Sequence, residues 1–104
     1  MDARIDPLRV LGLRVGDAHV LRNAGATVSD DVLRSLRVSQ SKLGTRRAIV
    51  MGHTDCAGYA SDEAAESAVR ESLRRIRGSS AVPDAFGLDG LMYDVRDGTV
   101  RPVD

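Results

Sequence analysis

Apolar residues at helical spacing predict two long helices. Over residues 30–43 they recur three and four positions apart, Ser29 is a suitable N-cap, and Gly44 is a natural stop. Over residues 62–77 a second pattern of this kind follows Ser61, and its apolar stripe is expected to face a sheet. The stripe consists of Ala65, Ala68, Val69, Ser72, Leu73 and Ile76.

Shorter apolar runs predict strands. Residues 47–52, "RAIVMG", lack polar alternation, which is typical of a parallel strand that helices cover on both faces. Residues 18–21, "AHVL", are predicted as a short strand, so that strand, helix and strand form a βαβ unit with a right-handed crossover. In the tail, apolar residues alternate on either side of Asp97 and Gly98, a pair that favours a two-residue hairpin turn. A single helical turn is expected over residues 7–12.

The composition is that of one small domain. The element order predicts a single α/β domain over residues 1–104, with a parallel β-sheet core flanked by helices and a C-terminal hairpin. Fifteen basic and fifteen acidic residues cancel, which argues against a nucleic-acid or anionic-membrane partner. The single cysteine cannot form an internal disulfide, which suits a reducing compartment. The first residues do not resemble a signal peptide. No apolar run approaches the roughly 20 residues that span a bilayer. We expect a soluble, cytoplasmic protein.

The candidate chemistry lies directly after the apolar run 47–52. His53 and the only cysteine, Cys56, stand three positions apart, and zinc accepts an imidazole together with a thiolate. The carboxyl end of a parallel strand is also where open α/β sheets build their sites. The spacing alone is a weak signal, because an unpaired cysteine commonly packs as a small apolar residue. Two donors also do not hold zinc firmly, so a third is needed.

The third donor has two candidates. His19 lies within the predicted strand 18–21, where a histidine is more often packed or solvent-facing than a metal ligand. Asp2 lies two positions before Arg4, so on an extended backbone their side chains point the same way and can form a bidentate pair. From the residues alone, a solvated terminal charge pair is the simpler interpretation of Asp2 and Arg4.

Several ordered motifs extend the pattern beyond a lone His-x-x-Cys. The chain begins with "MDAR", continues with "GDAHVLRNAG" over residues 16–25 and a Ser-Leu helix, and then has "HTDC" over residues 53–56. In this order the motifs resemble the core of the β-class carbonic anhydrases, particularly the small bacterial type. The similarity is dense over residues 1–56 and weaker in "ESLRRI" and "GLMYDV".

The resemblance implies a reaction and a set of site residues. It implies reversible hydration of CO2 to bicarbonate with Zn2+ as cofactor, and His53 and Cys56 as zinc ligands. Asp2 is implied to pair with Arg4 in the active state and to take the fourth zinc position in a closed state. The main-chain groups of residues 23–25 are implied to shape the floor of the CO2 pocket, although a tight loop explains them equally well. A homodimer or a higher homo-oligomer is also implied.

The family pattern includes one zinc ligand that these residues do not supply. Its first cysteine stands two positions before the aspartate, which corresponds to the position before Met1, and a central strand leads into it. Ala57 also replaces a glycine of the pattern. We therefore expect an N-terminally truncated domain whose first central strand is missing, so that two rows of main-chain groups are unpaired. Our hypothesis is that the 104 residues bind zinc weakly and hydrate CO2 poorly or not at all.

Two alternative functions are left open. A non-catalytic homologue would keep the fold as a binding or regulatory module, and substitution of Asp2 or His53 would then leave its role unchanged. Hydrolysis of CS2 or COS at the same zinc site is the other alternative, which substrate competition would distinguish.

Overall fold

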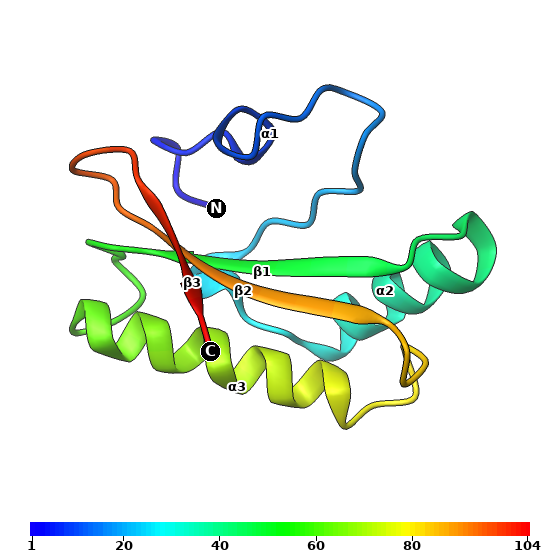
Figure 1. The fold of residues 1–104 in the computed structure, drawn as a ribbon. Coiled ribbons are helices and arrows are strands. Elements are labelled where there is room, and N and C mark those ends of the chain that lie inside the picture. The colour runs from blue at the N-terminus through cyan, green and yellow to red at the C-terminus, as the bar shows by residue number, and fades with distance from the viewer.

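The structure of residues 1–104 is a computed structural model, in which a long helix covers one face of a three-stranded sheet (Figure 1). The strands are β1 (Arg47–His53), β2 (Gly87–Tyr93) and β3 (Val100–Val103), in the spatial order β1-β2-β3. The helices are α1 (Pro7–Val10), α2 (Asp30–Leu43) and α3 (Asp62–Arg77), with a short 3-10 turn, η1, at Ala24–Ala26. β1 and β2 run parallel, whereas β2 and β3 are antiparallel. The α/β class is therefore confirmed.

Both long helices begin and end where their sequences predict. The hydroxyl groups of Ser29 and Ser61 each accept a hydrogen bond from a main-chain N–H in the first turn of the helix that follows. These caps satisfy amide groups that the start of a helix leaves without a partner. α2 ends at Gly44, which takes a left-handed φ of 76°, and α3 ends at Gly78. None of the helices combines the length and the apolar character needed to cross a membrane.

The core lies between α3 and one face of the sheet. Val50 of β1 and Met92 of β2 pack with Val69 and Ile76 of α3, and all four are buried. Gly52 permits the close approach, because a Cβ there would stand 2.7 Å from Cγ2 of Val69. Of the predicted apolar stripe, four residues are buried and two half-buried: Ala65, Val69, Ser72 and Ile76, and then Ala68 and Leu73.

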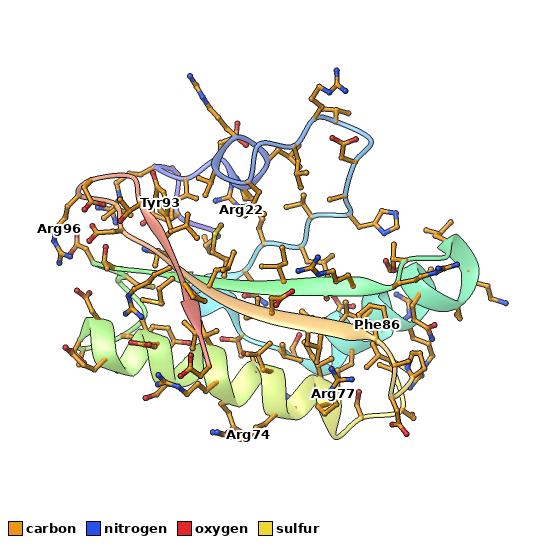
Figure 2. All side chains as sticks on the ribbon, in the orientation of Figure 1. Arg22, Arg74, Arg77, Phe86, Tyr93 and Arg96 are labelled. Atoms are coloured by element: carbon orange, nitrogen blue, oxygen red, sulfur yellow. The ribbon has the colours of Figure 1, made fainter.

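The loop between α3 and β2 is tied to the end of the helix. Arg77 donates hydrogen bonds to the carbonyl oxygens of Asp84 and Phe86, at 3.1 and 2.8 Å. Phe86 is buried at the start of β2, and Arg77 reaches it from α3 (Figure 2). This connection fixes where β2 begins beside β1.

The opposite face of the sheet is only partly covered. Residues 1–23, with α1, pass over it (Figure 1). Side chains of β1 alternate, so that Val50 is buried against α3 while Ile49 is 42% exposed on the other side. β1 is also an edge strand of the sheet. The absence of polar alternation in β1 therefore does not reflect helices packed on both of its faces.

Two further sequence predictions about strands are wrong. Residues 18–21 are extended but pair with no strand, so the βαβ unit consists instead of β1, α3 and β2. The C-terminal hairpin is confirmed, but Tyr93 pairs with Val100, so its loop is longer than two residues. A two-residue type I′ turn needs positive φ at both central residues, and only Gly98 of the pair takes one.

Candidate active site

The candidate site lies at the carboxyl end of β1. His53 ends the strand, and its Nδ1 lies 2.7 Å from the carbonyl oxygen of Thr54. A proton on Nδ1 donates to that oxygen, which leaves the lone pair of Nε2 available as a ligand. Nε2 lies 3.8 Å from Oδ2 of Asp2, too far for a direct hydrogen bond. The fold thus brings together Asp2 and His53, which are far apart in the sequence.

Arg4 holds the carboxylate of Asp2 in a bidentate pair. Its Nε donates to Oδ1 at 3.0 Å and its Nη2 to Oδ2 at 2.8 Å. The main-chain N–H of Arg4 also donates to Oδ1 at 2.8 Å. These hydrogen bonds, those of the Arg4 side chain foremost, hold the pKa of Asp2 well below its usual range. Asp2 is therefore ionised at neutral pH, and its oxygens act only as acceptors.

Asp55 supplies a second carboxylate that binds Arg4, which the sequence analysis did not identify. Its Oδ2 accepts from Nη1 of Arg4 at 3.0 Å, and its carbonyl oxygen accepts from Nη2 at 3.0 Å. Asp55 has a φ of 51°, uncommon for a residue with a side chain, and its N–H donates to Oδ1 of Asp62 at 2.9 Å. Its place between His53 and Cys56 was visible in the sequence, but its contact with Arg4 depends on the fold.

Residues 22–25 hold the first residues of the chain in place. Arg22 donates from Nη2 to the carbonyl oxygen of Asp2 at 2.7 Å. The ammonium group of Met1 donates to the carbonyl oxygen of Asn23 at 2.8 Å. The side chain of Asn23 closes its own loop by exchanging two hydrogen bonds with the main chain of Thr27. This loop therefore anchors the segment that carries Asp2 and Arg4.

A small cavity of about 30 Å³ lies beside the candidate metal donors. Six of its nine lining residues are hydrophobic, although polar and apolar atoms contribute about equally to its surface. The nine are Met1, Gly25, Ala26, Met51, Gly52, His53, Cys56, Tyr59 and Ala65. A cavity of this size has room for a molecule of only a few atoms, since a single water needs roughly 10–15 Å³. Cys56 is a free, half-buried thiol at its wall.

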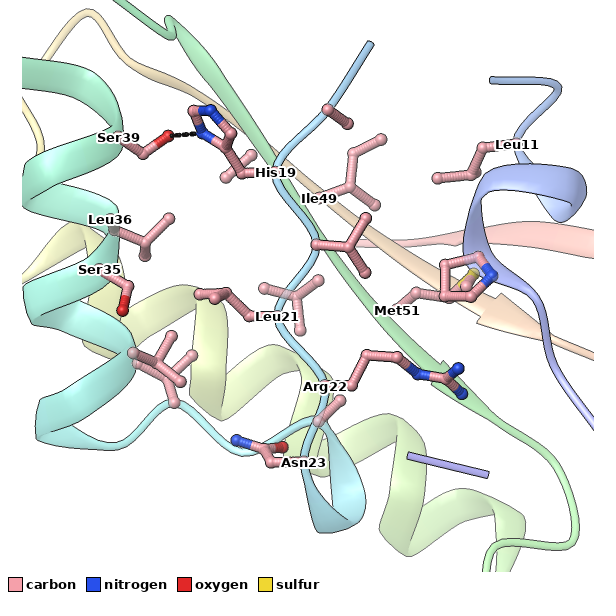
Figure 3. A pocket seen from close by; sticks show the side chains of 18 of the residues that line it. Leu11, His19, Leu21, Arg22, Asn23, Ser35, Leu36, Ser39, Ile49 and Met51 are labelled. Carbon is pink, nitrogen blue, oxygen red and sulfur yellow. Dashed lines mark hydrogen bonds between the residues drawn. The ribbon is translucent and has the colours of Figure 1, made fainter. Parts of the chain in front are cut away.

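The donor chemistry fits zinc, although three donors do not converge in this conformation. His53 and Cys56 line the same cavity, and their nitrogen and sulfur are ligands that zinc accepts. No group of three His, Cys, Asp or Glu side chains is arranged to hold a metal, and the Asp2 carboxylate is engaged by Arg4. His19, the other candidate, is exposed and lies 2.7 Å from Oγ of Ser39 on α2, toward the amino end of β1 (Figure 3).

A nitrogen and a sulfur donor at the end of a parallel strand, faced by a fixed carboxylate, suit an α/β enzyme that activates water on a metal. A protein-family model described as carbonic anhydrase matches residues 1–85. The chain therefore belongs to the carbonic anhydrase family.

Its relatives include a β-carbonic anhydrase and a carbon disulfide hydrolase. β-Carbonic anhydrase 1 of Mycobacterium tuberculosis is 40% identical over an alignment of 126 positions, which covers 99% of this chain and 77% of that protein. The crystal structure of a carbonic anhydrase from Streptococcus mutans superposes with a TM-score of 0.89 at 37% identity, over all of this chain and 77% of that one. A carbon disulfide hydrolase of Saccharolobus solfataricus is 46% identical over 56 residues, covering 54% of this chain and 28% of that protein.

Proposed function

We propose that this chain catalyses the reversible hydration of CO2 to bicarbonate. The observation that carries the proposal is the Asp2–Arg4 pair, which presents an ionised carboxylate 3.8 Å from Nε2 of His53. Membership of the carbonic anhydrase family and the similarity to the M. tuberculosis enzyme support the same reaction.

Zn2+ is the proposed cofactor, with His53 and Cys56 as two of its ligands. Asp2 is the proposed third protein ligand in a closed state, which it reaches by giving up its bidentate pair with Arg4. When bound, the ion lowers the pKa of a water molecule from about 15.7 to roughly 7 and so supplies hydroxide at neutral pH.

In the open state, in which Arg4 holds the carboxylate of Asp2, this carboxylate is proposed to orient the reacting water. The ionised carboxylate accepts a hydrogen bond from that water, and Arg4 keeps the carboxylate pointing at the site. Asp55 and Arg22 fix the arrangement further, one by binding the guanidinium and the other by binding the Asp2 carbonyl. The small cavity beside His53 is the proposed place for CO2, and of the implied floor residues 23–25 it is Gly25 that lines this cavity.

The two histidines of the chain supply a matched test of the metal site. His53→Ala should lower the zinc content of the purified protein, measured by elemental analysis, because it removes one of two firm donors. His19→Ala, at the exposed histidine bonded to Ser39, should leave the zinc content unchanged. Equal zinc content in the two variants would refute the assignment of His53.

Asp2→Asn tests the proposed role of the carboxylate. The amide keeps the size of the side chain but loses the charge-assisted pair with Arg4, so CO2 hydration by stopped flow should fall by about tenfold to a hundredfold per bound zinc. An unchanged rate per zinc would instead favour a non-catalytic homologue or another base.

We also propose that the 104 residues bind zinc weakly, because only two firm donors face the cavity. The resemblance puts a cysteine at the position before Met1, so a version carrying Cys there should hold about one zinc per chain. The same extension with Ala is the control. Stoichiometric zinc and rapid hydration in the 104-residue protein would refute weak binding while supporting the reaction itself.

Hydrolysis of CS2 is a second candidate, which the similarity of 56 residues to a carbon disulfide hydrolase favours. A competition experiment distinguishes the two substrates. If CO2 is the substrate, CS2 should not be turned over, and it should inhibit CO2 hydration only weakly. Rapid release of sulfide from CS2 would reverse the assignment.

A cytoplasmic location and a homodimer or higher homo-oligomer complete the proposal. The free, half-buried thiol of Cys56 is consistent with a reducing compartment. Cell fractionation tests the location. Sedimentation over a range of protein concentrations tests the assembly, and a monomer at every concentration would contradict it.

A further inference from the structure

Arg4 is held by two carboxylates, although only one of them belongs to the Asp2–Arg4 pair. Its side chain makes four hydrogen bonds, two with Asp2 and two with Asp55. The side chain of Arg4 is 50% exposed, and a single ion pair at such a place contributes little free energy, because water competes for both charges. The contacts with Asp55 therefore matter for how firmly the guanidinium group keeps its position.

The two contacts with Asp55 depend on the conformation of its main chain. One of them uses the main-chain carbonyl oxygen, so its direction follows the backbone angles of Asp55. The φ of 51° lies in the left-handed region, which is unfavourable for a residue with a side chain. A residue keeps such a conformation only where neighbouring contacts hold it there. Without such a contact, Asp55 would relax and move its carbonyl and its carboxylate away from Arg4.

Asp62 supplies the contact that holds the main chain of Asp55. It is the first residue of α3, directly after the Ser61 cap, and its Oδ1 accepts a hydrogen bond from the N–H of Asp55 at 2.9 Å. This hydrogen bond is the main cause that lowers the pKa of Asp62 below its ordinary value. The carboxylate is therefore ionised at neutral pH and acts only as an acceptor.

The other oxygen of Asp62 is bound from the hairpin between β2 and β3. Nη2 of Arg96, which lies on the hairpin loop (Figure 2), donates to Oδ2 of Asp62 at 3.3 Å. The main-chain N–H of Arg96 donates to Oδ1 of Asp94 at 2.8 Å, which fixes the loop itself. The side chains of Arg96 and Asp62 are both partly exposed, so we expect this ion pair to support the position of Asp62 only weakly.

The residue before Asp55 is fixed by the same hairpin. Thr54 is buried, its N–H donates to the carbonyl oxygen of Tyr93 at 2.9 Å, and its hydroxyl group accepts from the N–H of Val95 at 3.0 Å. The hairpin thus anchors the loop at Thr54, and Asp62 anchors it at Asp55. Loss of the Asp62 contact should therefore release Asp55 while Thr54 stays in place.

We propose that Asp62 is a positioning residue for the Asp2–Arg4 pair. It holds the left-handed main chain of Asp55, and Asp55 in turn holds the guanidinium group of Arg4. The part that this gives Asp62 in CO2 hydration rests on the proposed function, whereas its effect on Arg4 does not. The simpler alternative is that Asp62 only stabilises the start of α3 by its negative charge.

Two conservative substitutions separate these interpretations. Asp62→Asn loses the charge but keeps an oxygen at the same reach, so it can still accept from the N–H of Asp55. Asp62→Glu keeps a negative charge in the first turn of the helix, but its carboxylate is one methylene further from the main chain. The positioning role predicts that Asn is tolerated and Glu is not, whereas stabilisation of α3 by charge alone predicts the reverse.

The readout is the exchange of the Arg4 Nε–H proton with water, followed by NMR in the metal-free protein. This proton is donated to Asp2, and its signal is the one that Arg4→Lys removes. Exchange should be at least about threefold faster in Asp62→Glu than in the native chain and nearly unchanged in Asp62→Asn. Native-like exchange in Asp62→Glu, or equal acceleration in both variants, would overturn the proposal.

Asp30 supplies the matched control. It is the first residue of α2, follows the Ser29 cap, and pairs with Nη2 of Arg75 at 2.6 Å. Asp30→Glu and Asp30→Asn therefore change the corresponding helix position without a link to Arg4, and neither should alter the exchange of its Nε–H. Acceleration in either variant would show that this proton only follows the overall stability, which would overturn the proposal.

The hydration rate per bound zinc tests the consequence for the reaction. Asp62→Glu should lower it by about threefold to tenfold, but should have no further effect once Asp2→Asn has removed the carboxylate that Arg4 orients. An equal loss in both backgrounds would overturn the positioning role. If the native chain hydrates no CO2 even with zinc bound, the proposed function fails, and the exchange of the Arg4 proton alone decides the role of Asp62.

Discussion

The hydroxyl group of Tyr59 donates a hydrogen bond to the carbonyl oxygen of Gly25 at 2.9 Å. The aromatic ring also fills the space beside the glycine, because a Cβ on Gly25 would stand 2.7 Å from that hydroxyl oxygen. Tyr59 lies in the loop that carries Cys56, and Gly25 lies in the loop that anchors Met1. This contact therefore joins the two loops on either side of the candidate substrate cavity.

Gly25→Ala should destabilise the protein more than Gly44→Ala. Both glycines have nearly the same left-handed φ, 77° and 76°, so alanine costs about 1–2 kcal/mol of backbone strain at either position. Only at Gly25 does the new methyl group collide with Tyr59, which adds about 1–3 kcal/mol. Urea unfolding of the two variants measures the difference, and equal losses would show that Tyr59 moves aside freely.

Met92→Ala should be among the most damaging single truncations. The side chain is 1% exposed and packs in the cluster between the sheet and α3, so its removal should cost about 2–5 kcal/mol of unfolding free energy. Met51, on the opposite face of the neighbouring strand, is half-buried, and Met51→Ala is the control with a smaller expected loss. A similar loss in both variants would place the core on both faces of the sheet.

Ser61→Ala should lower the free energy of unfolding by about 1 kcal/mol, because it removes the hydroxyl group that accepts a hydrogen bond from the N–H of Ala64 at the start of α3. Ser41→Ala is the matched control, since Ser41 is exposed inside α2 and only bonds back to the carbonyl of Arg37. Alanine there should be neutral or slightly stabilising, as its helix propensity is higher. Thermal unfolding by circular dichroism follows both variants.

Glu66→Gln should destabilise the protein at neutral pH but not in acid. Hydrogen bonds from Arg101, the main cause, and the charge of Arg70 lower the pKa of Glu66 from its ordinary value of 4.5. Because the folded-state pKa is lower than the unfolded one, the stabilisation is fully present above about pH 4.5. It is lost as the pH falls through the lowered folded-state value.

Melting temperatures of the native chain and of Glu66→Gln should therefore differ by a few degrees at pH 7 and converge in acid. Glu71→Gln, at a well-exposed pair with Arg74, is the control and should have the smaller effect at every pH. A difference between Glu66→Gln and the native chain that persists unchanged at the lowest pH would show that Glu66 acts through packing rather than charge.

The extended residues 18–21 and the hairpin turn mark where sequence reasoning failed. An extended conformation is a local property, and the sequence predicted it for residues 18–21. A β-strand also needs hydrogen bonds to a second segment, and no segment of this chain pairs with residues 18–21. At Asp97 and Gly98 the pair of residue types suits a tight turn, but the register between Tyr93 and Val100 leaves a longer loop.

The sequence by itself determined both long helices and the apolar run of β1, and it placed the candidate metal donors His53 and Cys56 just after that run. These features depend on spacing and caps within a few residues, which act the same way in any surroundings. The bidentate geometry of Asp2 and Arg4 was also accessible, because the two residues are close in the chain.

Only the tertiary structure decided which distant groups meet. It placed Asp2 across from His53, put the carboxylate of Asp55 on Arg4, and left β1 with an open edge beside residues 18–22. Each of these depends on how separate elements pack together, because hydrogen bonds and apolar contacts act over a few ångströms in space whatever the separation along the chain.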